Sequence, residues 1–255
     1  MIEKTDAIIL KSKKYRDTSK LITLYSKEYG KLNMIAKGSR SKNSKFGGSL
    51  ETLSYVSIVF YNYPNKEFQY ITQASINDFF HKIHGDINKT MTAMAIAEIV
   101  NNTTHPNDKN ESIFDLLLNT FSALNDSADQ FLRYMVYFQI HYANSIGYSP
   151  DFCCCSACGK QIDKSYRDDS IFFNLEGGSV FCAKCAPKIA VVLKKVKPAI
   201  SRIIRKYSEI ESTEIKEYSL PESLIHETFS LLHLYLKNHV TGMKDLKSLD
   251  LMFNM

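Results

Sequence analysis

The chain has 255 residues, of which 44% are hydrophobic, including 15 Phe and 15 Tyr, so it can build apolar cores and is not an intrinsically disordered chain. Its formal net charge is only +5, but residues 1–50 hold twelve Lys and Arg against four acids, so the first fifth of the chain carries +8 and the rest carries −3. A positive field concentrated in this way predicts a polyanionic partner and favours nucleic acid over a membrane surface.

The sequence contains no apolar run long enough to span a bilayer and no N-terminal apolar stretch that would suit a signal peptide. We therefore expect a cytoplasmic protein, in a compartment where thiols stay reduced.

The sequence predicts five strands in the N-terminal region. β-branched and aromatic residues, with polar turns between them, predict strands near residues 7–12, 20–26, 31–38, 52–63 and 68–76. The short connection containing Gly30 predicts a hairpin of the second and third strands. Five strands with short turns and one longer loop favour a small barrel such as the OB-fold, and an open five-stranded meander is the alternative.

The longer loop, "KGSRSKNSKFGGSL" at residues 37–50, combines cations with glycines and serines and predicts a flexible, positively charged segment. We expect its basic residues and those at the end of the first strand to line one barrel mouth and bind phosphates: Lys11, Lys13, Lys14, Arg16, Lys37, Arg40, Lys42 and Lys45. Tyr15, Tyr25 and Phe46 are candidates for stacking on bases, although aromatics of small barrels usually lie in the core. The alternative for the cations is a solvated face.

The hydrophobic period becomes helical after about residue 86. Apolar spacing predicts helices near residues 88–101, 111–124, 127–147 and 221–242, and a helix over 186–209 that is interrupted near Pro198. We expect the later helices to pack with the earlier ones, so that the segment between them is an insertion in one helical domain.

All six cysteines fall between residues 153 and 185. Two CxxC pairs, Cys155 with Cys158 and Cys182 with Cys185, predict two knuckles that together form a four-thiolate zinc site. Four thiolates leave no coordination position for water, so such a site is structural and not hydrolytic. The CxxC register favours Cys155 over Cys154. "FFNLEGGSVFC" predicts a hairpin between the knuckles that turns at Gly177 and Gly178.

Several catalytic signatures are missing from the sequence. It contains no GxxxxGK[ST], no GxG, no HExxH and no GxSxG, and its acids are scattered. The sequence therefore predicts no catalytic residues and favours a protein that is not an enzyme.

Together these features resemble the RecO family of bacterial recombination mediators. The resemblance rests on "DAIILKSKKYRDTSKLITLYSKEYGKLNMIAKGSRSKNSKFGG", on the "CxxCG…F…GG…CxxC" segment and on the ending "HVTGMKDLKSLDLM". It implies an α+β multidomain fold: an OB-fold domain over residues 1–80, a helical domain over 81–150 and 188–255, and an inserted four-cysteine zinc ribbon over 151–187.

The resemblance also implies function. It implies a nucleoid-associated protein without catalytic activity that binds single- and double-stranded DNA, anneals complementary strands and helps to load the recombinase RecA on DNA covered by single-strand-binding protein. The implied partners are RecR and the acidic C-terminal tail of single-strand-binding protein, with RecA contacted indirectly. Arg133, Arg202 and Arg205 are the candidate cations for that tail, with Lys194 and Lys195 beside them. The alternative function is a zinc-ribbon factor that binds or modifies RNA.

Overall fold

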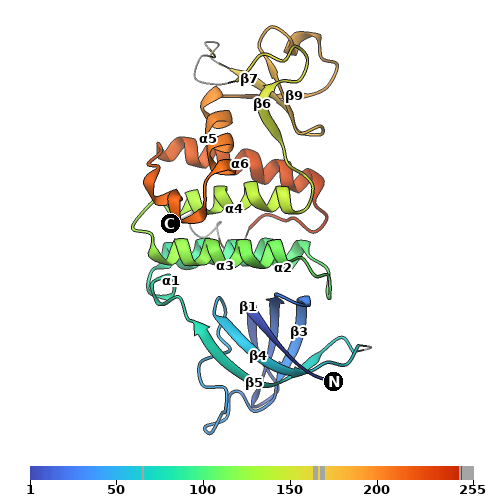
Figure 1. Ribbon diagram of the computed structural model, residues 1–255, viewed down its shortest axis with the longest axis vertical. Coiled ribbons are helices and arrows are strands. Elements are labelled where there is room, and N and C mark those ends of the chain that lie inside the picture. The colour runs from blue at the N-terminus through green and yellow to red at the C-terminus, as the bar shows by residue number, and fades with distance from the viewer. Residues whose placement is uncertain (65, 163–165, 167–169, 247, 249–255) are drawn as a thin grey trace. The chain divides into compact units, whose positions relative to one another are not determined.

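The computed structural model describes residues 1–64, 66–162, 166, 170–246 and 248. The described chain forms two compact units (Figure 1): Met1–Asp126 with the C-terminal segment from Lys244, and Ser127–Met243. In the described part of the chain, no helix combines the length and the apolar character needed to cross a membrane. In the C-terminal motif, Lys247 and residues 249–252 lie outside the described residues. The predicted domain boundaries stay predictions.

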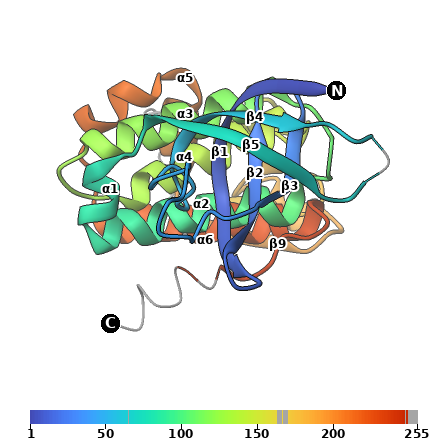
Figure 2. The same ribbon diagram turned by 90° about the horizontal axis from the view of Figure 1, so that it is seen from below.

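The first unit contains a closed barrel of five strands in the order β1-β2-β3-β5-β4. Its strands are β1 (Ile2–Tyr15), β2 (Ser19–Ser26), β3 (Gly30–Ala36), β4 (Tyr55–Tyr61) and β5 (Gln69–Asp78). Neighbours pair antiparallel except β3 and β5, which pair parallel and close the barrel. The predicted OB-fold is confirmed, and so is the hairpin of β2 and β3. Figure 2 shows the β4–β5 connection projecting from the barrel.

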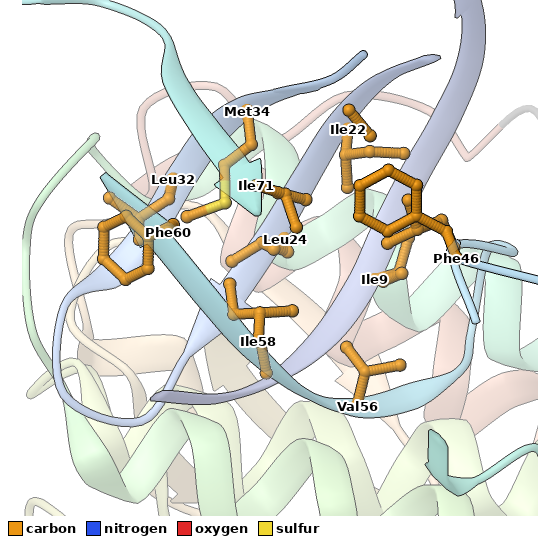
Figure 3. Packing of buried hydrophobic residues seen from close by; sticks show 13 residues of the cluster. Ile9, Ile22, Leu24, Leu32, Met34, Phe46, Val56, Ile58, Phe60 and Ile71 are labelled. Atoms are coloured by element: carbon orange, nitrogen blue, oxygen red, sulfur yellow. The ribbon is translucent and has the colours of Figure 1, made fainter. Parts of the chain in front are cut away.

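Alternation of side chains gives this sheet one apolar face. In β3 and β4 every second residue is buried, as in the inward set Val56, Ile58 and Phe60 of β4. One face of each strand therefore supplies the barrel core, and the other faces outward. The core is shown in Figure 3, with Leu24, Leu32, Met34 and Ile71 among its members.

Three helices belong to the same unit as the barrel. They are α1 (His81–Gly85), α2 (Ile87–Thr103) and α3 (Glu111–Asp126), and both α2 and α3 contact β1. Helix α2 starts where Asp86 accepts hydrogen bonds from the backbone N–H groups of Asn88 and Lys89, an ordinary N-terminal cap. The helices predicted at 88–101 and 111–124 are thus confirmed to within a few residues.

The second unit combines helices with a four-stranded sheet. Its helical elements are α4 (Leu132–Ser145), α5 (Pro198–Glu209), α6 (Glu222–His239) and the short 3₁₀ turns η1 (Ala186–Lys188) and η2 (Ser212–Glu217). Its strands, β6 (Asp151–Cys155), β7 (Ile171–Asn174), β8 (Ser179–Cys182) and β9 (Leu193–Val196), follow the order β6-β8-β7-β9. The predicted hairpin is confirmed as β7 and β8, where Asn174 pairs with Ser179.

The helix predicted over residues 186–209 is wrong in its first half. Residues 193–196 form β9, which pairs antiparallel with β7, and the helix begins only at Pro198. Proline fixes φ and has no N–H to lose in a first helical turn, so Pro198 starts α5 instead of interrupting it. The two lysines of β9 are exposed and its Val196 is buried, which suits a strand at a sheet edge.

Candidate nucleic-acid interface and metal centre

The loop between β3 and β4 closes one end of the barrel. Its Phe46 and Leu50 are buried in the barrel core, exposed to only 3% and 1%. Figure 3 shows the ring of Phe46 beside Ile9 and Ile22. The loop therefore acts as a plug for an otherwise open barrel mouth. Phe46 and Tyr25 are buried, so the expectation that these two rings stack on bases is wrong, while Tyr15 is half-buried.

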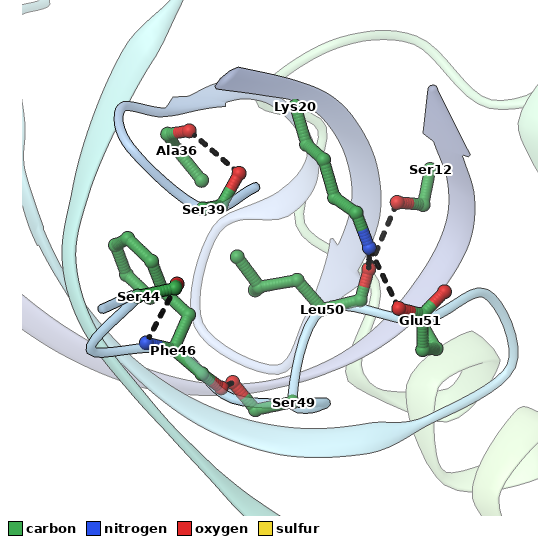
Figure 4. Close-up of polar contacts among 9 residues, drawn as sticks. All are labelled: Ser12, Lys20, Ala36, Ser39, Ser44, Phe46, Ser49, Leu50 and Glu51. Atoms are coloured by element: carbon green, nitrogen blue, oxygen red, sulfur yellow. Dashed lines mark hydrogen bonds and ion pairs between the residues drawn. The ribbon is translucent and has the colours of Figure 1, made fainter. Parts of the chain in front are cut away.

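The serines of this loop form hydrogen bonds to its backbone and so order it. Ser39 Oγ donates to Ala36 O at 2.9 Å, Ser49 Oγ donates to Phe46 O at 2.5 Å, and Ser44 Oγ accepts from Phe46 N at 3.2 Å (Figure 4). Serines bond readily to nearby backbone groups in turns. The predicted flexible segment is thus a series of hydrogen-bonded turns. Sequence reasoning missed this role, although the Ser-rich spacing was a signal for it.

The loop is also joined to the β1–β2 turn. Arg40 N donates to Thr18 O at 2.8 Å, and Arg40 Nη1 donates to Arg16 O at 3.2 Å. Ser12 Oγ donates to Leu50 O at 2.8 Å (Figure 4). Two segments that are separate in sequence, residues 11–16 and 37–45, therefore lie next to each other.

All eight predicted cations are exposed or partly exposed, and we call them the basic rim: Lys11, Lys13, Lys14, Arg16, Lys37, Arg40, Lys42 and Lys45. Within the described residues, no ion pair is found for the last seven of them. Several cations lie over rings instead, with Lys37 Nζ 4.6 Å from the centroid of Tyr70 and Lys45 Nζ 5.4 Å from that of Phe46. Seven of the eight rim cations thus present charge that no carboxylate of the described chain pairs with.

Other N-terminal cations have partners inside the unit. Lys20 Nζ lies 2.7 Å from Glu51 Oε1, and Lys27 Nζ lies 3.3 Å from Glu111 Oε1. Lys31 Nζ donates to carbonyl oxygens at the end of α2, and burial lowers the pKa of Lys31. The structure therefore separates cations that stabilise the fold from those of the rim.

The second unit brings all four predicted ligand cysteines together. The sulfurs of Cys155, Cys158, Cys182 and Cys185 lie within 4.8 Å of one another, and Cys158 Sγ is 3.9 Å from Cys182 Sγ. Four sulfurs at about 2.3 Å from one tetrahedral ion would be separated by about 3.8 Å. The cluster therefore fits a tetrahedral metal ion, while Cys153 is exposed and Cys154 lies outside the cluster.

Local backbone geometry forms the two knuckles. Gly159 has φ +71° and its N–H donates to Cys155 O at 2.8 Å, which turns the chain after the first pair. Cys185 N donates to Cys182 O at 3.0 Å in the second. Burial disfavours the Cys155 thiolate, but backbone hydrogen bonds at Cys182, Ala157 and Cys158 outweigh burial and lower the pKa of Cys155 to about 6. This favours the thiolate at Cys155, whereas side-chain hydrogen bonds with Cys182 and Cys158 raise the pKa of Cys185 to about 12.

The three arginines predicted for partner binding do not form one group. Arg133 is only 3% exposed, pairs with Asp129 at 3.1 Å and donates to Tyr218 O at 3.2 Å. Arg205 lines a cavity of about 380 Å³ that also contains Asp151 and Glu209. These two arginines therefore have acids close to them.

Arg202 lies in different surroundings. It lines a mostly apolar groove of about 540 Å³, with Lys206 as a second cation and with Ala199, Ile203, Tyr207, Tyr218, Leu220 and Leu224 as the other lining residues. Lys194 and Lys195 line another cavity, of about 670 Å³, beside α6. The Arg202 groove alone joins a predicted arginine to an apolar floor among these described cavities.

Two family models together match nearly the whole chain. One, described as recombination protein O N terminal, matches residues 1–80, and the other, described as recombination protein O C terminal, matches residues 84–250. "DNA repair protein RecO" of Salinibacter ruber is 27% identical over 186 residues, which cover 73% of this chain and 69% of the relative. The proteins of that name from Chlorobium luteolum and Chloroherpeton thalassium are 31% identical over 64% of this chain and 24% identical over 98% of it. The matches cover 61% of the Chlorobium protein, less than two thirds of its length, and 98% of the Chloroherpeton protein.

Proposed function

The chain belongs to the recombination protein O (RecO) family, and from this we propose that it is a DNA-binding protein of recombinational repair that anneals complementary strands and assists recombinase loading on single-stranded DNA covered by single-strand-binding protein. It acts on DNA without breaking bonds and without a nucleotide cofactor. Its family membership supports the role in DNA repair and recombination.

The observation that carries this proposal is the joining of the two basic segments by Arg40. Because Arg40 donates to Thr18 O and to Arg16 O, the cations of residues 11–16 and 37–45 act as one surface. Each cation that meets a phosphate releases counterions, which drives binding without regard to sequence. A surface that neutralises two strands at once also lowers their mutual repulsion, and this is the physical basis of annealing.

A salt series tests the basic rim. Lys37, Arg40, Lys42 and Lys45 are all changed to Ala, and anisotropy of labelled single-stranded DNA is measured. We expect weaker binding and a log–log salt slope shallower by about 2 to 3, because each phosphate contact on a single strand contributes about 0.7. The matched control changes four exposed or partly exposed lysines of the other unit, Lys188, Lys194, Lys195 and Lys237, to Ala. An unchanged slope in the first variant, or an equal change in the control, would reject the rim.

An annealing assay separates the proposal from the RNA-directed alternative. Complementary strands mixed with the protein without nucleotide should anneal faster, and structured RNA should compete poorly with single-stranded DNA. A modified nucleotide after incubation with RNA would favour the alternative instead.

For the metal we propose one structural zinc ion on Cys155, Cys158, Cys182 and Cys185. Zinc is the usual ion for four thiolates in tetrahedral geometry. When bound, it would cross-link the two knuckles and would supply no reaction chemistry, because all four coordination positions are taken by sulfur.

We propose the Arg202 groove for the acidic tail of single-strand-binding protein, with RecR as a further partner and a cytoplasmic, nucleoid-associated location. An apolar floor with cations suits a peptide that combines acidic and apolar residues. Arg202→Glu should abolish binding of the tail peptide, and Arg205→Glu, which lies beside acids in another cavity, is the control. Loss in both variants, or in neither, would remove the groove from the proposal. Arg133 stays a prediction, and its guanidinium is already engaged by Tyr218 O.

A further inference from the structure

Three tyrosines of the barrel, two exposed and one half-buried, form a row with two lysines. Tyr61 ends β4, Tyr63 follows it, and Tyr70 lies near the start of β5, directly opposite Tyr61 in the strand pairing. Ring centroids are 6.2 Å apart for Tyr61 and Tyr63 and 6.4 Å apart for Tyr63 and Tyr70. Lys66 Nζ lies 4.5 Å from the centroid of Tyr63, and Lys37 Nζ lies 4.6 Å from that of Tyr70. We call these five residues the tyrosine strip.

The rings of the strip leave aromatic surface open to solvent. Tyr61 and Tyr63 are 41% and 37% exposed, and Tyr70 is half-buried. The planes of Tyr61 and Tyr63 are tilted by 35°, and those of Tyr63 and Tyr70 by 86°, so the rings are not stacked face to face. Contiguous exposed aromatic surface on a folded domain usually marks a binding site.

A buried amide fixes the strip's connection between β4 and β5. Gln69 is 5% exposed; its Oε1 accepts from Tyr63 N at 2.7 Å, and its Nε2 donates to Tyr63 O at 3.0 Å and to Lys66 O at 2.9 Å. One side chain therefore holds the backbone of both the exposed ring and the lysine above it. Binding there therefore costs less conformational entropy of the protein than binding to a freely moving loop would.

Charge and ring chemistry together select the ligand. Every nucleobase has a flat π-face that stacks on an aromatic ring, and the adjoining phosphates attract lysines. A cation over an exposed ring is held only weakly, so Lys37 and Lys66 can exchange the ring for a phosphate, which is a stronger partner. Lys37 is also a member of the basic rim, so the strip and the rim form a continuous surface.

We propose that the tyrosine strip is a stacking platform for unpaired bases of single-stranded DNA. The inference rests on the proposed function, because it extends a rim that holds the sugar–phosphate chain to a surface that holds bases. Bases in a duplex stack on each other and leave no face for the strip. The strip therefore favours single strands over duplexes, which the charges of the rim alone do not.

The test compares two ligands with the full chain. One is single-stranded oligodeoxythymidine, and the other is an abasic oligomer with the same number of phosphates, both followed by anisotropy at one salt concentration. Tyr63→Ala should weaken binding of the base-bearing strand by about 5-fold or more and leave the abasic strand unchanged. Tyr63→Phe keeps the ring and should bind both strands as the wild type does.

A control and a local probe complete the design. Tyr148 is 43% exposed in the other compact unit, so Tyr148→Ala removes a comparable ring and should change neither affinity. A strand carrying 2-aminopurine should lose fluorescence on binding to the wild type, as a stacked base does, and less on binding to Tyr63→Ala.

The outcomes separate the platform from the rim. If Tyr63→Ala weakens both strands equally or neither, the platform is wrong, and a loss of abasic binding in the rim variant would still support the proposed function. A strip that binds protein instead of DNA would give the same unchanged affinities and would overturn the platform. If the wild type binds neither strand, both proposals fail.

Discussion

Replacing Phe46 with Ala should open the plugged end of the barrel. The ring is 3% exposed and belongs to the same buried cluster as Ile9 and Ile22 (Figure 3). Its backbone N–H and C=O are both engaged by serines of the same loop. The substitution thus removes the largest apolar anchor of residues 37–50 while every charge of the basic rim stays in the chain.

The expected cost is large for one substitution. Truncation of a buried Phe to Ala typically destabilises by about 3–5 kcal/mol, since transfer energy is lost and a cavity remains. The site lies at the end of the barrel, where the loop can partly collapse, so we expect a cost of about 3 kcal/mol. Because the loop carries Lys42 and Lys45, its release should also weaken DNA binding although no cation is removed.

The assay has to report on the barrel alone. The chain forms two compact units that need not unfold together, so hydrogen exchange of the β1–β5 amides is a better measure than a whole-chain urea signal. Phe46→Leu keeps most of the apolar volume and should cost less than half as much. Lys45→Ala should leave barrel stability within about 0.5 kcal/mol and make the salt slope shallower by about 0.7.

The role of Phe46 as the anchor of the loop would be rejected if Phe46→Ala cost less than about 1 kcal/mol in the barrel and left tryptic cleavage at Lys42 and Lys45 unchanged. The loop would then be held by its serines and strand contacts, and the Phe46 ring would contribute little to its anchoring.

Three further predictions concern metal, backbone and pH. Cys182→Ser should abolish bound zinc in a colorimetric assay and unfold the second unit, whereas Cys153→Ser, outside the cluster, should keep one ion per chain. Gly30→Ala should destabilise the barrel by more than about 1 kcal/mol in exchange experiments, because φ is +65° and a Cβ would lie 2.0 Å from a carbonyl oxygen; Gly48→Ala, with nothing within 4 Å, should be tolerated. Burial lowers the pKa of His141, so protonation of His141 costs more in the folded second unit than in the unfolded chain; the stability of the unit should be full above the unfolded pKa of about 6.5 and fall as pH drops towards the lower folded pKa, and hydrogen-exchange protection of the α4–α6 amides should fall with it in the wild type and less in His141→Gln.

The barrel and the metal cluster could be predicted from the sequence because each follows a local pattern of residues. Alternation along β3 and β4 fixes which side chains face inward, and the CxxC spacing fixes two sulfurs per knuckle. A turn at Gly178, with φ +62°, then brings the second knuckle back towards the first. In both cases the inward-facing or metal-binding residues repeat a spacing that can be seen in the sequence, even though the contacts they make join distant segments.

The sequence did not predict the fold of the loop, the tyrosine strip or β9, because each depends on tertiary neighbours. In the sequence, Phe46 is an isolated aromatic residue in a polar loop, and its burial depends on the open barrel mouth that it fills. Tyr61 and Tyr70 read as strand aromatics, and their pairing across β4 and β5 is what makes them a row. Residues 193–196 have helical spacing, but β7 offers a strand edge to pair with them.

The way the loop is anchored explains how so much positive charge can stay available in a folded domain. Its anchors are the apolar Phe46 and Leu50, hydroxyls that bond to carbonyl oxygens, and the ion pair of Lys20 with Glu51, in which the cation comes from β2 and not from the rim (Figure 4). Had the rim cations themselves anchored the loop by ion pairs, each pair would have to break before a phosphate could bind, and the affinity would fall by that cost. Because no cation of residues 37–45 anchors the loop through an ion pair in the described chain, folding and phosphate binding use different groups. Folding stability of the barrel should accordingly depend little on salt, while DNA affinity should depend on it steeply.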